Sequence, residues 1–250
     1  MHYVERPGKE PAVLCIHGYC QSSAYWVPTL ERLGMAGIQG LAPDLPGFAA
    51  SASLPGPYTM VGYADRLAEF LDDRGLQRVA LVGGSMGGVV AQFFALRHPA
   101  RLVRLLLVAT GGFTADPAAG LARAETIAAG PWNQKTVRPI VAGFFHRAPD
   151  AARIEEFQRI ALQASQKAAV EAARSNAEAR PFDRLGEIRL PTLIVQGRHD
   201  RARTPEHGAL MRERIPGARL EVLENCGHTP QLEEPDAFHD LVLPFLLAGR

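Results

Sequence analysis

The sequence predicts an α/β protein with a mostly parallel central sheet that helices cover on both faces. Short apolar runs alternate along the chain with segments of helical spacing, which is typical of strand–helix–strand units. Several of the runs are too apolar to face water on either side, as expected for strands of a parallel sheet. The length of 250 residues suits one sizeable domain, with room for an inserted subdomain.

Six apolar runs are expected to be strands, and five segments between them to be helices. The expected strands cover residues 12–16, 38–42, 79–82, 102–108, 192–196 and 219–223. The expected helices cover residues 25–33, 61–74, 89–96, 206–214 and 236–247. In such an arrangement, functional side chains gather beyond the carboxyl ends of the strands.

One segment, residues 112–184, shows no strand pattern. It is rich in alanine and is too long for a plain loop in a compact domain, and four prolines divide it: Pro131, Pro139, Pro149 and Pro181. We therefore expect a helical cap inserted into a core of residues 1–111 and 185–250. Trp132, Phe144 and Phe145 of this segment are candidates for substrate binding, although packing of the cap on the core is the favoured interpretation for each one.

Composition excludes several classes of protein. The net charge is +1 and the arginines are scattered, so the sequence does not predict a nucleic-acid partner. Cys15, Cys20 and Cys226 lack CxxC spacing, which argues against a metal site or a disulfide framework and fits reduced thiols in a cytoplasm. The N-terminus lacks the apolar core of a signal peptide, and no apolar run approaches the ~20 residues that span a membrane.

The stretch 82–88, Val-Gly-Gly-Ser-Met-Gly-Gly, predicts a nucleophile elbow around Ser85. A β-branched run ends abruptly in glycine before the serine, and two more glycines and a helical segment follow it. A serine at such a turn projects its hydroxyl outward, and the helix N-terminus favours developing negative charge.

A serine nucleophile needs a base, and the base needs an orienting acid. Asp200 follows the expected strand 192–196, and His228 follows the next one. The chain order Ser, Asp, His is the one expected when the elbow comes first. His199 is the rival base, and Asp116 is the alternative acid.

Two backbone amides are the expected donors to an oxyanion. The Met86 amide lies at the start of the helix after Ser85. The Tyr19 amide follows Gly18 in the loop after the strand 12–16, where glycine permits a tight turn.

At these positions the chain resembles the α/β-hydrolase superfamily, specifically its cap-bearing branch of esterases, lactonases, haloperoxidase-like enzymes and C–C hydrolases. The resemblance implies Ser85 as nucleophile, Asp200 as acid and His228 as base, with Tyr19 and Met86 as oxyanion amides. It also implies a sheet of about seven strands and no metal or organic cofactor. The motifs that carry it are residues 17–19, 43–48, 83–88, 197–200 and 227–228.

The chain departs from the family pattern in two places. Ala49 stands where a second loop glycine is usual, and only 16 residues precede His17, so the first family strand is expected to be absent.

Serine rather than aspartate at the elbow implies acyl chemistry on a small, mostly apolar carboxylic ester, lactone or thioester. C–C hydrolysis of the aromatic meta-cleavage type is the alternative, and a non-catalytic ligand-binding member is a third possibility. Arg147, Arg174 and Arg180 could bind a substrate carboxylate or simply be solvated. The oligomeric state stays open.

Overall fold

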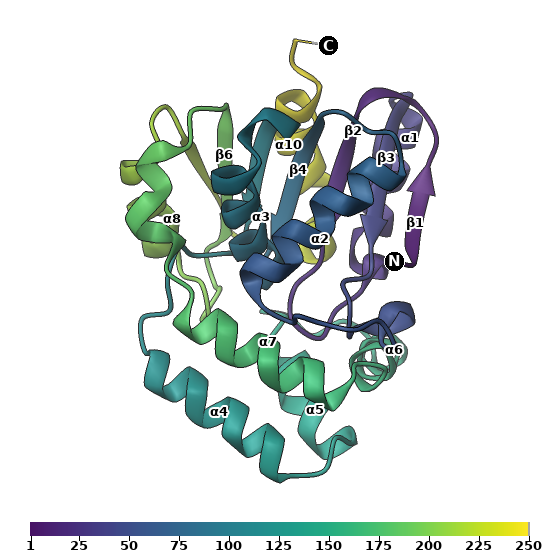
Figure 1. Cartoon of the computed structure of the whole chain (residues 1–250), viewed down its shortest axis with the longest axis vertical. Helices are drawn as coiled ribbons and strands as arrows, with labels where there is room; N and C mark the ends of the chain where they lie inside the picture. The colour runs from purple at the N-terminus through teal and green to yellow at the C-terminus, as the bar shows by residue number, and fades with distance from the viewer. Residues whose placement is uncertain (250) are drawn as a thin grey trace.

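A computed structural model describes residues 1–249, and its centre is a seven-stranded sheet in the order β1-β3-β2-β4-β5-β6-β7 (Figure 1). β1 is antiparallel to β3, and all other neighbours are parallel. The strands are β1 (Tyr3–Arg6), β2 (Lys9–Ile16), β3 (Ile38–Pro43), β4 (Val79–Gly84), β5 (Leu102–Val108), β6 (Thr192–Gly197) and β7 (Arg219–Leu223).

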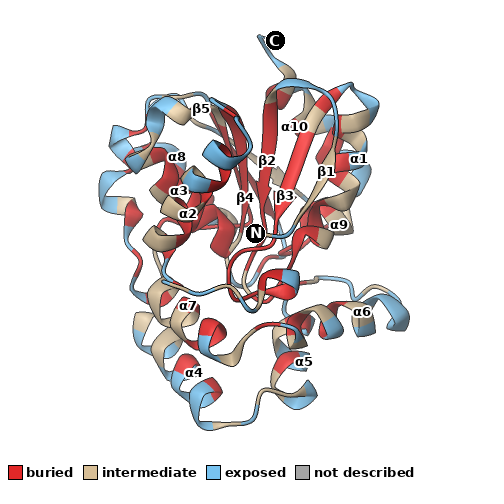
Figure 2. Ribbon diagram, turned by 45° about the vertical axis from the view of Figure 1, so that its right-hand side comes forward, coloured by how far each residue is buried: buried red, intermediate tan, exposed pale blue. Residues whose placement is uncertain are grey.

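Helices cover both faces of the sheet because the central strands are apolar on both sides (Figure 2). On β5, Leu105 and Leu107 face one cluster of core residues, while Leu106 and Val108 face the other. The first cluster includes residues of α2 (Met60–Asp73), α3 (Met86–Arg97) and α8 (Pro205–Arg214). The second includes residues of α1 (Val27–Met35) and α10 (Pro235–Leu247).

The strand register brings the carboxyl ends of the central strands to one edge of the sheet. Gly84 of β4 pairs with Val108 of β5, which pairs in turn with Val195 of β6. The loops that follow these strands therefore emerge side by side, although they are far apart in the sequence.

Four helices lie between β5 and β6 in the chain and below the sheet in Figure 1. They are α4 (Pro117–Ala129), α5 (Gln134–Ala142), α6 (Ala151–Leu162) and α7 (Gln166–Glu178), followed by a 3-10 helix, Pro181–Glu187. The Ser165 amide donates to the Gly47 carbonyl at 2.9 Å, and the Tyr19 hydroxyl donates to the Ala169 carbonyl at 3.0 Å. These contacts connect the helices to the loops at the carboxyl edge of the sheet.

The structure confirms the α/β fold and its seven strands, and it corrects several element boundaries. Tyr3–Arg6 is an edge strand that the six apolar runs did not include, because its four residues are only half-buried. β2 begins at Lys9, earlier than expected, with exposed residues. Pro139 lies inside α5 rather than at a boundary. Among the described residues, no helix is long and apolar enough to cross a membrane.

Candidate active site

Ser85 occupies the sharp turn between β4 and α3. Its backbone has φ 52° and ψ −119°, a left-handed φ that a side chain rarely adopts. Two hydrogen bonds hold the turn: the Ser85 amide donates to the Val108 carbonyl at 2.9 Å, and the Thr110 hydroxyl donates to the Ser85 carbonyl at 2.7 Å. The neighbouring strand β5 and its loop thus brace the strained residue from both ends.

Positions 83 and 87 require glycine, because neighbouring backbone atoms fill the space that a Cβ would occupy. A Cβ at Gly83 would lie 2.4 Å from the Gly87 carbonyl oxygen. A Cβ at Gly87 would lie 2.5 Å from the carbonyl oxygens of Ile16 and His17. Both distances are impossible for a real side chain, so the elbow requires glycine on both sides of Ser85.

The structure brings Ser85, His228 and Asp200 into one chain of hydrogen bonds. His228 Nε2 lies 2.7 Å from Ser85 Oγ, and His228 Nδ1 lies 2.7 Å from Asp200 Oδ2. A carboxylate oxygen accepts, so Nδ1 carries the hydrogen of a neutral ring. Nε2 is then free to accept from the Ser85 hydroxyl, which is the arrangement that a general base requires.

Asp200 is held from its other side by backbone amides. Its Oδ1 accepts from the amides of Ala202 at 2.8 Å and Arg203 at 2.9 Å. Asp200 is 3% exposed and His228 is 8% exposed, whereas Ser85 is half-buried. The carboxylate therefore has a fixed orientation and little contact with solvent, while Ser85 is more exposed than either of its partners.

The amides of Tyr19 and Met86 have no acceptor within residues 1–249. The Tyr19 loop lies close to Ser85, since a Cβ added at Gly18 would be 3.0 Å from Ser85 Cβ. The Gly18 amide donates to Gln21 Oε1 at 2.8 Å, which fixes the turn. Two unpaired donors thus flank the serine from β2 and α3.

His17 stabilises the loop 17–21 through both of its ring nitrogens. Its Nε2 accepts from the Leu45 amide at 2.9 Å and its Nδ1 donates to the Gly18 carbonyl at 2.8 Å. Burial lowers the pKa of His17, with the nearby Asp44 carboxylate and the Gly18 hydrogen bond opposing that effect. The ring is therefore neutral and has no nitrogen left for chemistry.

Residues 13–241 match the family model described as the alpha/beta hydrolase family. The chain belongs to this family. It is 31% identical over 265 residues to 2-hydroxy-6-oxo-6-phenylhexa-2,4-dienoate hydrolase of Comamonas testosteroni, covering 98% of this chain and 91% of that one.

Two solved esterase structures are similar in fold. A thermophilic esterase from Thermogutta terrifontis has a TM-score of 0.85 at 27% identity, covering 98% of this chain and 92% of that one. An esterase from Exiguobacterium antarcticum has a TM-score of 0.91 at 22% identity, covering 98% and 94%. At that identity the second likeness shows the fold alone.

The three aromatic residues predicted to bind substrate lie differently in this hydrolase. The Phe144 ring stacks beside the His228 ring, with centroids 6.3 Å apart and 20° between their planes. The Phe145 ring lies 6.4 Å from the Phe144 ring and stacks on Phe157 at 5.4 Å, measured between centroids. Trp132 packs against the core and forms no aromatic contact with the site in the described chain.

Two further residues belong to this aromatic group: Phe157, another aromatic residue of the segment 112–184, and Tyr25, which the sequence pattern did not assign to it. Tyr25 lies 6.0 Å from Phe144 and 4.5 Å from Phe157, measured between ring centroids. Tyr25 precedes α1 and Phe157 belongs to α6, so no local pattern places them together. The Tyr25 hydroxyl is buried without a hydrogen-bond partner among the described residues.

Asp116, the alternative acid, and His199, the rival base, both make contacts away from Ser85. Asp116 caps α4 by accepting from the Ala119 amide at 2.9 Å. His199 stacks on His146 at 3.8 Å rather than contacting Ser85. Burial raises the pKa of Cys226 to about 12, so this thiol stays protonated and is a poor nucleophile.

Of the arginines proposed for a substrate carboxylate, Arg174 instead pairs with Glu125 at 2.8 Å. Arg147 and Arg180 are exposed and make no side-chain ion pair in the described part of the chain. Arg203, which the sequence analysis did not consider, is half-buried beside Asp200, and burial lowers its pKa against the effect of that carboxylate.

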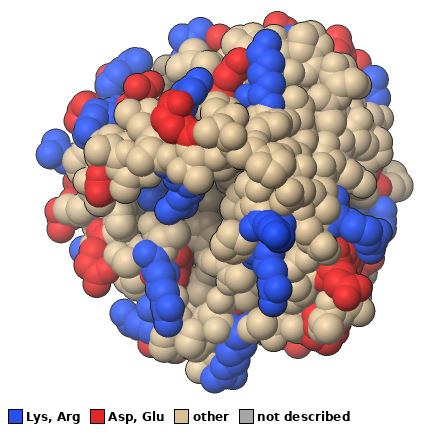
Figure 3. Space-filling view, turned by 90° about the horizontal axis from the view of Figure 1, so that it is seen from below, with Lys and Arg blue, Asp and Glu red and all other residues tan. Residues whose placement is uncertain are grey.

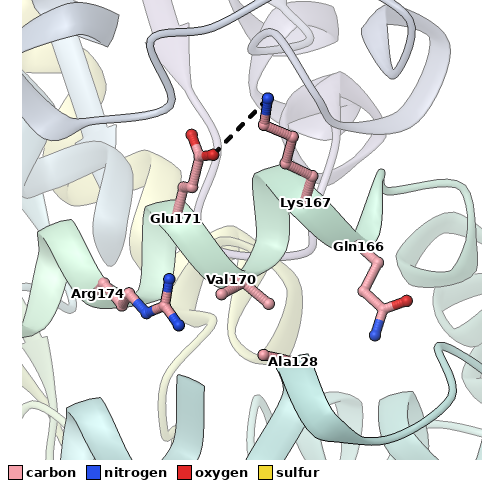
Figure 4. Close-up of a pocket in the computed structure, with 6 residues that line it drawn as sticks. All are labelled: Ala128, Gln166, Lys167, Val170, Glu171 and Arg174. Atoms are coloured by element: carbon pink, nitrogen blue, oxygen red, sulfur yellow. Dashed lines mark ion pairs between the residues drawn. The ribbon is translucent and has the colours of Figure 1, made fainter. Parts of the chain in front are cut away.

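Seen from the side of α4–α7, the surface of the hydrolase is hollowed near its centre, and Lys and Arg side chains lie around the hollow (Figure 3). A groove of about 330 Å³ lies between α4 and α7 and contains none of Ser85, Asp200 and His228 (Figure 4). Its lining residues are Ala128, Gln166, Lys167, Val170, Glu171 and Arg174.

Within residues 1–249, no cluster of His, Cys, Asp or Glu could hold a metal ion.

Proposed function

We propose that this hydrolase cleaves a small, mostly apolar carboxylic ester, lactone or thioester through an acyl-enzyme on Ser85. The observation that carries the proposal is the continuous hydrogen-bond chain from Ser85 Oγ through His228 to Asp200. Such a chain activates a hydroxyl that would otherwise be a weak nucleophile at neutral pH.

In the first half of the reaction, Ser85 Oγ attacks the carbonyl carbon while its proton moves to His228 Nε2. Asp200 stabilises the imidazolium that forms, because its Oδ2 faces Nδ1. The bond from this carbon to the leaving oxygen, or to the leaving sulfur of a thioester, then breaks, and His228 returns the proton to that departing atom. In the second half, His228 takes a proton from water, the hydroxide attacks the acyl carbon, and Ser85 leaves with its proton restored.

The negative oxygen of each tetrahedral intermediate needs donors that are already in place. The unpaired amides of Tyr19 and Met86 are suited to this role, since neither must give up another hydrogen bond first. Preorganised donors of this kind contribute roughly 2.7–4 kcal/mol each to transition-state stability.

The helices α4–α7 act in this proposal as a cap, defined as residues 112–184. Phe144 next to His228, with Tyr25 and Phe157 behind it, supports an apolar acyl or aryl group in the substrate. An aromatic wall excludes water and strengthens the electrostatic interactions inside the site.

C–C bond hydrolysis is the second candidate, favoured by the 31% identity to a 2-hydroxy-6-oxo-6-phenylhexa-2,4-dienoate hydrolase over 98% of the chain. The same triad would attack a ketone carbonyl, and a carbon leaving group would receive the proton. The two candidates therefore differ in the atom that is protonated rather than in the nucleophile.

A fluorophosphonate probe tests the shared step. We expect stoichiometric labelling of Ser85 in the wild type and none in Ser85→Ala. Folded wild-type protein that resists the probe would contradict a serine hydrolase and favour a non-catalytic ligand-binding protein.

A substrate panel then separates the two candidates. We expect aryl esters of increasing acyl length to be hydrolysed with a kcat/KM that rises with apolar length before it declines. Turnover of a vinylogous 1,5-diketone at a higher kcat/KM than every ester would instead assign C–C hydrolysis.

A further inference from the structure

Glu233, at the end of the short helix α9 (Pro230–Glu233), joins two segments that are far apart in the sequence. Its Oε1 accepts from the amides of Gly227 at 3.0 Å and Thr229 at 3.1 Å, which lie on either side of His228. Its Oε2 accepts from the His146 amide at 2.7 Å and lies 3.4 Å from the Arg147 amide. Oε1 thus binds the loop that carries His228, and Oε2 binds the connection between α5 and α6.

Backbone amides, rather than a cationic side chain, balance the charge of this carboxylate. Among residues 1–249, no Lys or Arg forms an ion pair with Glu233. Hydrogen bonds to a charged acceptor are stronger than those between neutral groups. The planar carboxyl group therefore sets the spacing between the two segments that it joins.

Three further contacts seat the connection 144–147 on the same loop. The Thr229 hydroxyl donates to the Phe144 carbonyl at 3.0 Å. The His146 ring stacks on His199, next to Asp200, with 3.8 Å between centroids and 12° between planes. Gly227 faces the connection so closely that a Cβ there would lie 2.9 Å from the His146 nitrogen.

We propose that Glu233 is a positioning residue that couples docking of the connection 144–147 to the orientation of His228. When the connection lifts, the carboxylate loses its Oε2 donors and can turn toward solvent. The amides of Gly227 and Thr229 then lose their shared acceptor, and the imidazole between them loses its alignment with Ser85. This inference rests on the proposed role of His228 and adds control of that role by the cap.

The test compares Glu233→Gln with Glu233→Asp and with the neighbouring Glu234→Gln. Gln keeps the length but offers one acceptor oxygen, and Asp keeps the charge but is one methylene too short to reach both segments. Glu234 makes no side-chain hydrogen bond in the described structure, so its variant is a matched control. A purely electrostatic role predicts that Asp behaves as the wild type, whereas the bridge predicts that Asp behaves as Gln.

Hydrogen exchange gives a readout that does not depend on activity. In both Glu233 variants we expect amides 146 and 147 and amides 227 and 229 to exchange at least tenfold faster together. Exchange in the core strand β4 should stay unchanged, which separates local opening from unfolding. Faster exchange of 146 and 147 with full protection of 227 and 229 would overturn the coupling, as would acceleration that only parallels β4.

The rate of fluorophosphonate labelling reports the alignment of His228 with Ser85. We expect it to fall about 10- to 100-fold in Glu233→Gln and Glu233→Asp, part of the roughly 10²–10⁴-fold that a positioned base contributes, and to stay within twofold in Glu234→Gln. A rate unchanged in all three variants would refute the positioning role. Failure of the wild type to react would refute the proposed function alone, because the exchange experiment would still test the bridge.

Discussion

The imidazole of His228 is held at both nitrogens, by Ser85 Oγ and by Asp200 Oδ2. Replacing His228 with Ala removes the proposed base without disturbing the buried core, since the residue lies in a loop after β7. We expect kcat to fall by about 10³-fold or more with little change in Tm. Steady-state kinetics on an aryl ester, with circular dichroism of the folded protein, measures both.

His98→Ala is the control for that experiment. His98 follows α3 and lies 3.0 Å from Asp65, away from the site. Its removal should leave kcat near the wild-type value. Near wild-type activity in His228→Ala would show that another group acts as the base.

Ala49 occupies a left-handed conformation, with φ 44°, in the loop where the family pattern has glycine. The turn is therefore retained without the glycine, at a cost of about 1–2 kcal/mol for a residue with a Cβ. Replacing Ala49 with Gly relieves this strain but adds the greater entropy of an unfolded glycine, about 0.5–1 kcal/mol. We expect a net stabilisation of about 0.5–1 kcal/mol in urea unfolding.

Ala52→Gly is the matched control, because Ala52 lies in the same loop with φ −59°. There is no strain to relieve at that position, so Gly should destabilise the protein by about 0.5–1 kcal/mol. Equal losses at both positions would contradict the strain at Ala49.

At the level of elements, the junction of β4 and α3 depends on the close approach of β2. Gly87→Ala forces a Cβ against the carbonyl oxygens of Ile16 and His17. Because these are backbone atoms with no freedom to rotate away, we expect a destabilisation of about 2–4 kcal/mol, typical of severe overpacking. The lost elbow geometry should abolish fluorophosphonate labelling in any protein that still folds.

Gly186→Ala provides the comparison, since a Cβ there meets only the Arg214 carbonyl oxygen at 3.7 Å, an ordinary contact. Its free energy of unfolding should change by less than about 0.5 kcal/mol. A Gly87 variant as stable as this control would mean that the junction can widen.

The central elements were predictable because each has a strong local signal. β4 and β6 are buried along their length, β5 is buried except at Val103 and Arg104, and the glycines mark where β4 ends. β1 lacked such a signal because its four residues are all half-buried and it pairs only at the sheet edge. Pro139 was misleading because a proline removes one N–H donor and disfavours a helix interior, yet α5 continues through it.

At the level of the whole molecule, buried histidines make stability depend on pH. Burial lowers the pKa of both His17 and His239 in the folded protein. The unfolded chain, with histidine pKa values near 6.5, therefore binds more protons at acidic pH than the native state does. The free energy of unfolding should be constant above about pH 6.5 and should fall as the pH decreases from there, by up to about 1.4 kcal/mol per pH unit for each group.

Urea unfolding at pH 7.5 and 5.0 measures this dependence. His239, on α10, is 1% exposed, and its Nε2 lies 2.9 Å from the Thr29 hydroxyl of α1, so the ring is not hydrogen-bonded to Ser85, Asp200 or His228. His239→Gln removes one titrating group, so its loss of stability between the two pH values should be smaller than that of the wild type. An identical loss in both proteins would show that His239 does not contribute.

The sequence by itself determined the α/β alternation, the helical nature of residues 112–184 and the loops that hold Ser85, Asp200 and His228. These follow from the hydrophobic period and from turn chemistry, both of which act over a few residues. Only the tertiary structure decided that Phe144 lies against His228 and that Glu233 joins two distant segments. Contacts of this kind depend on how α4–α7 dock on the sheet, and neither period nor spacing in the chain encodes which side chains meet across that boundary.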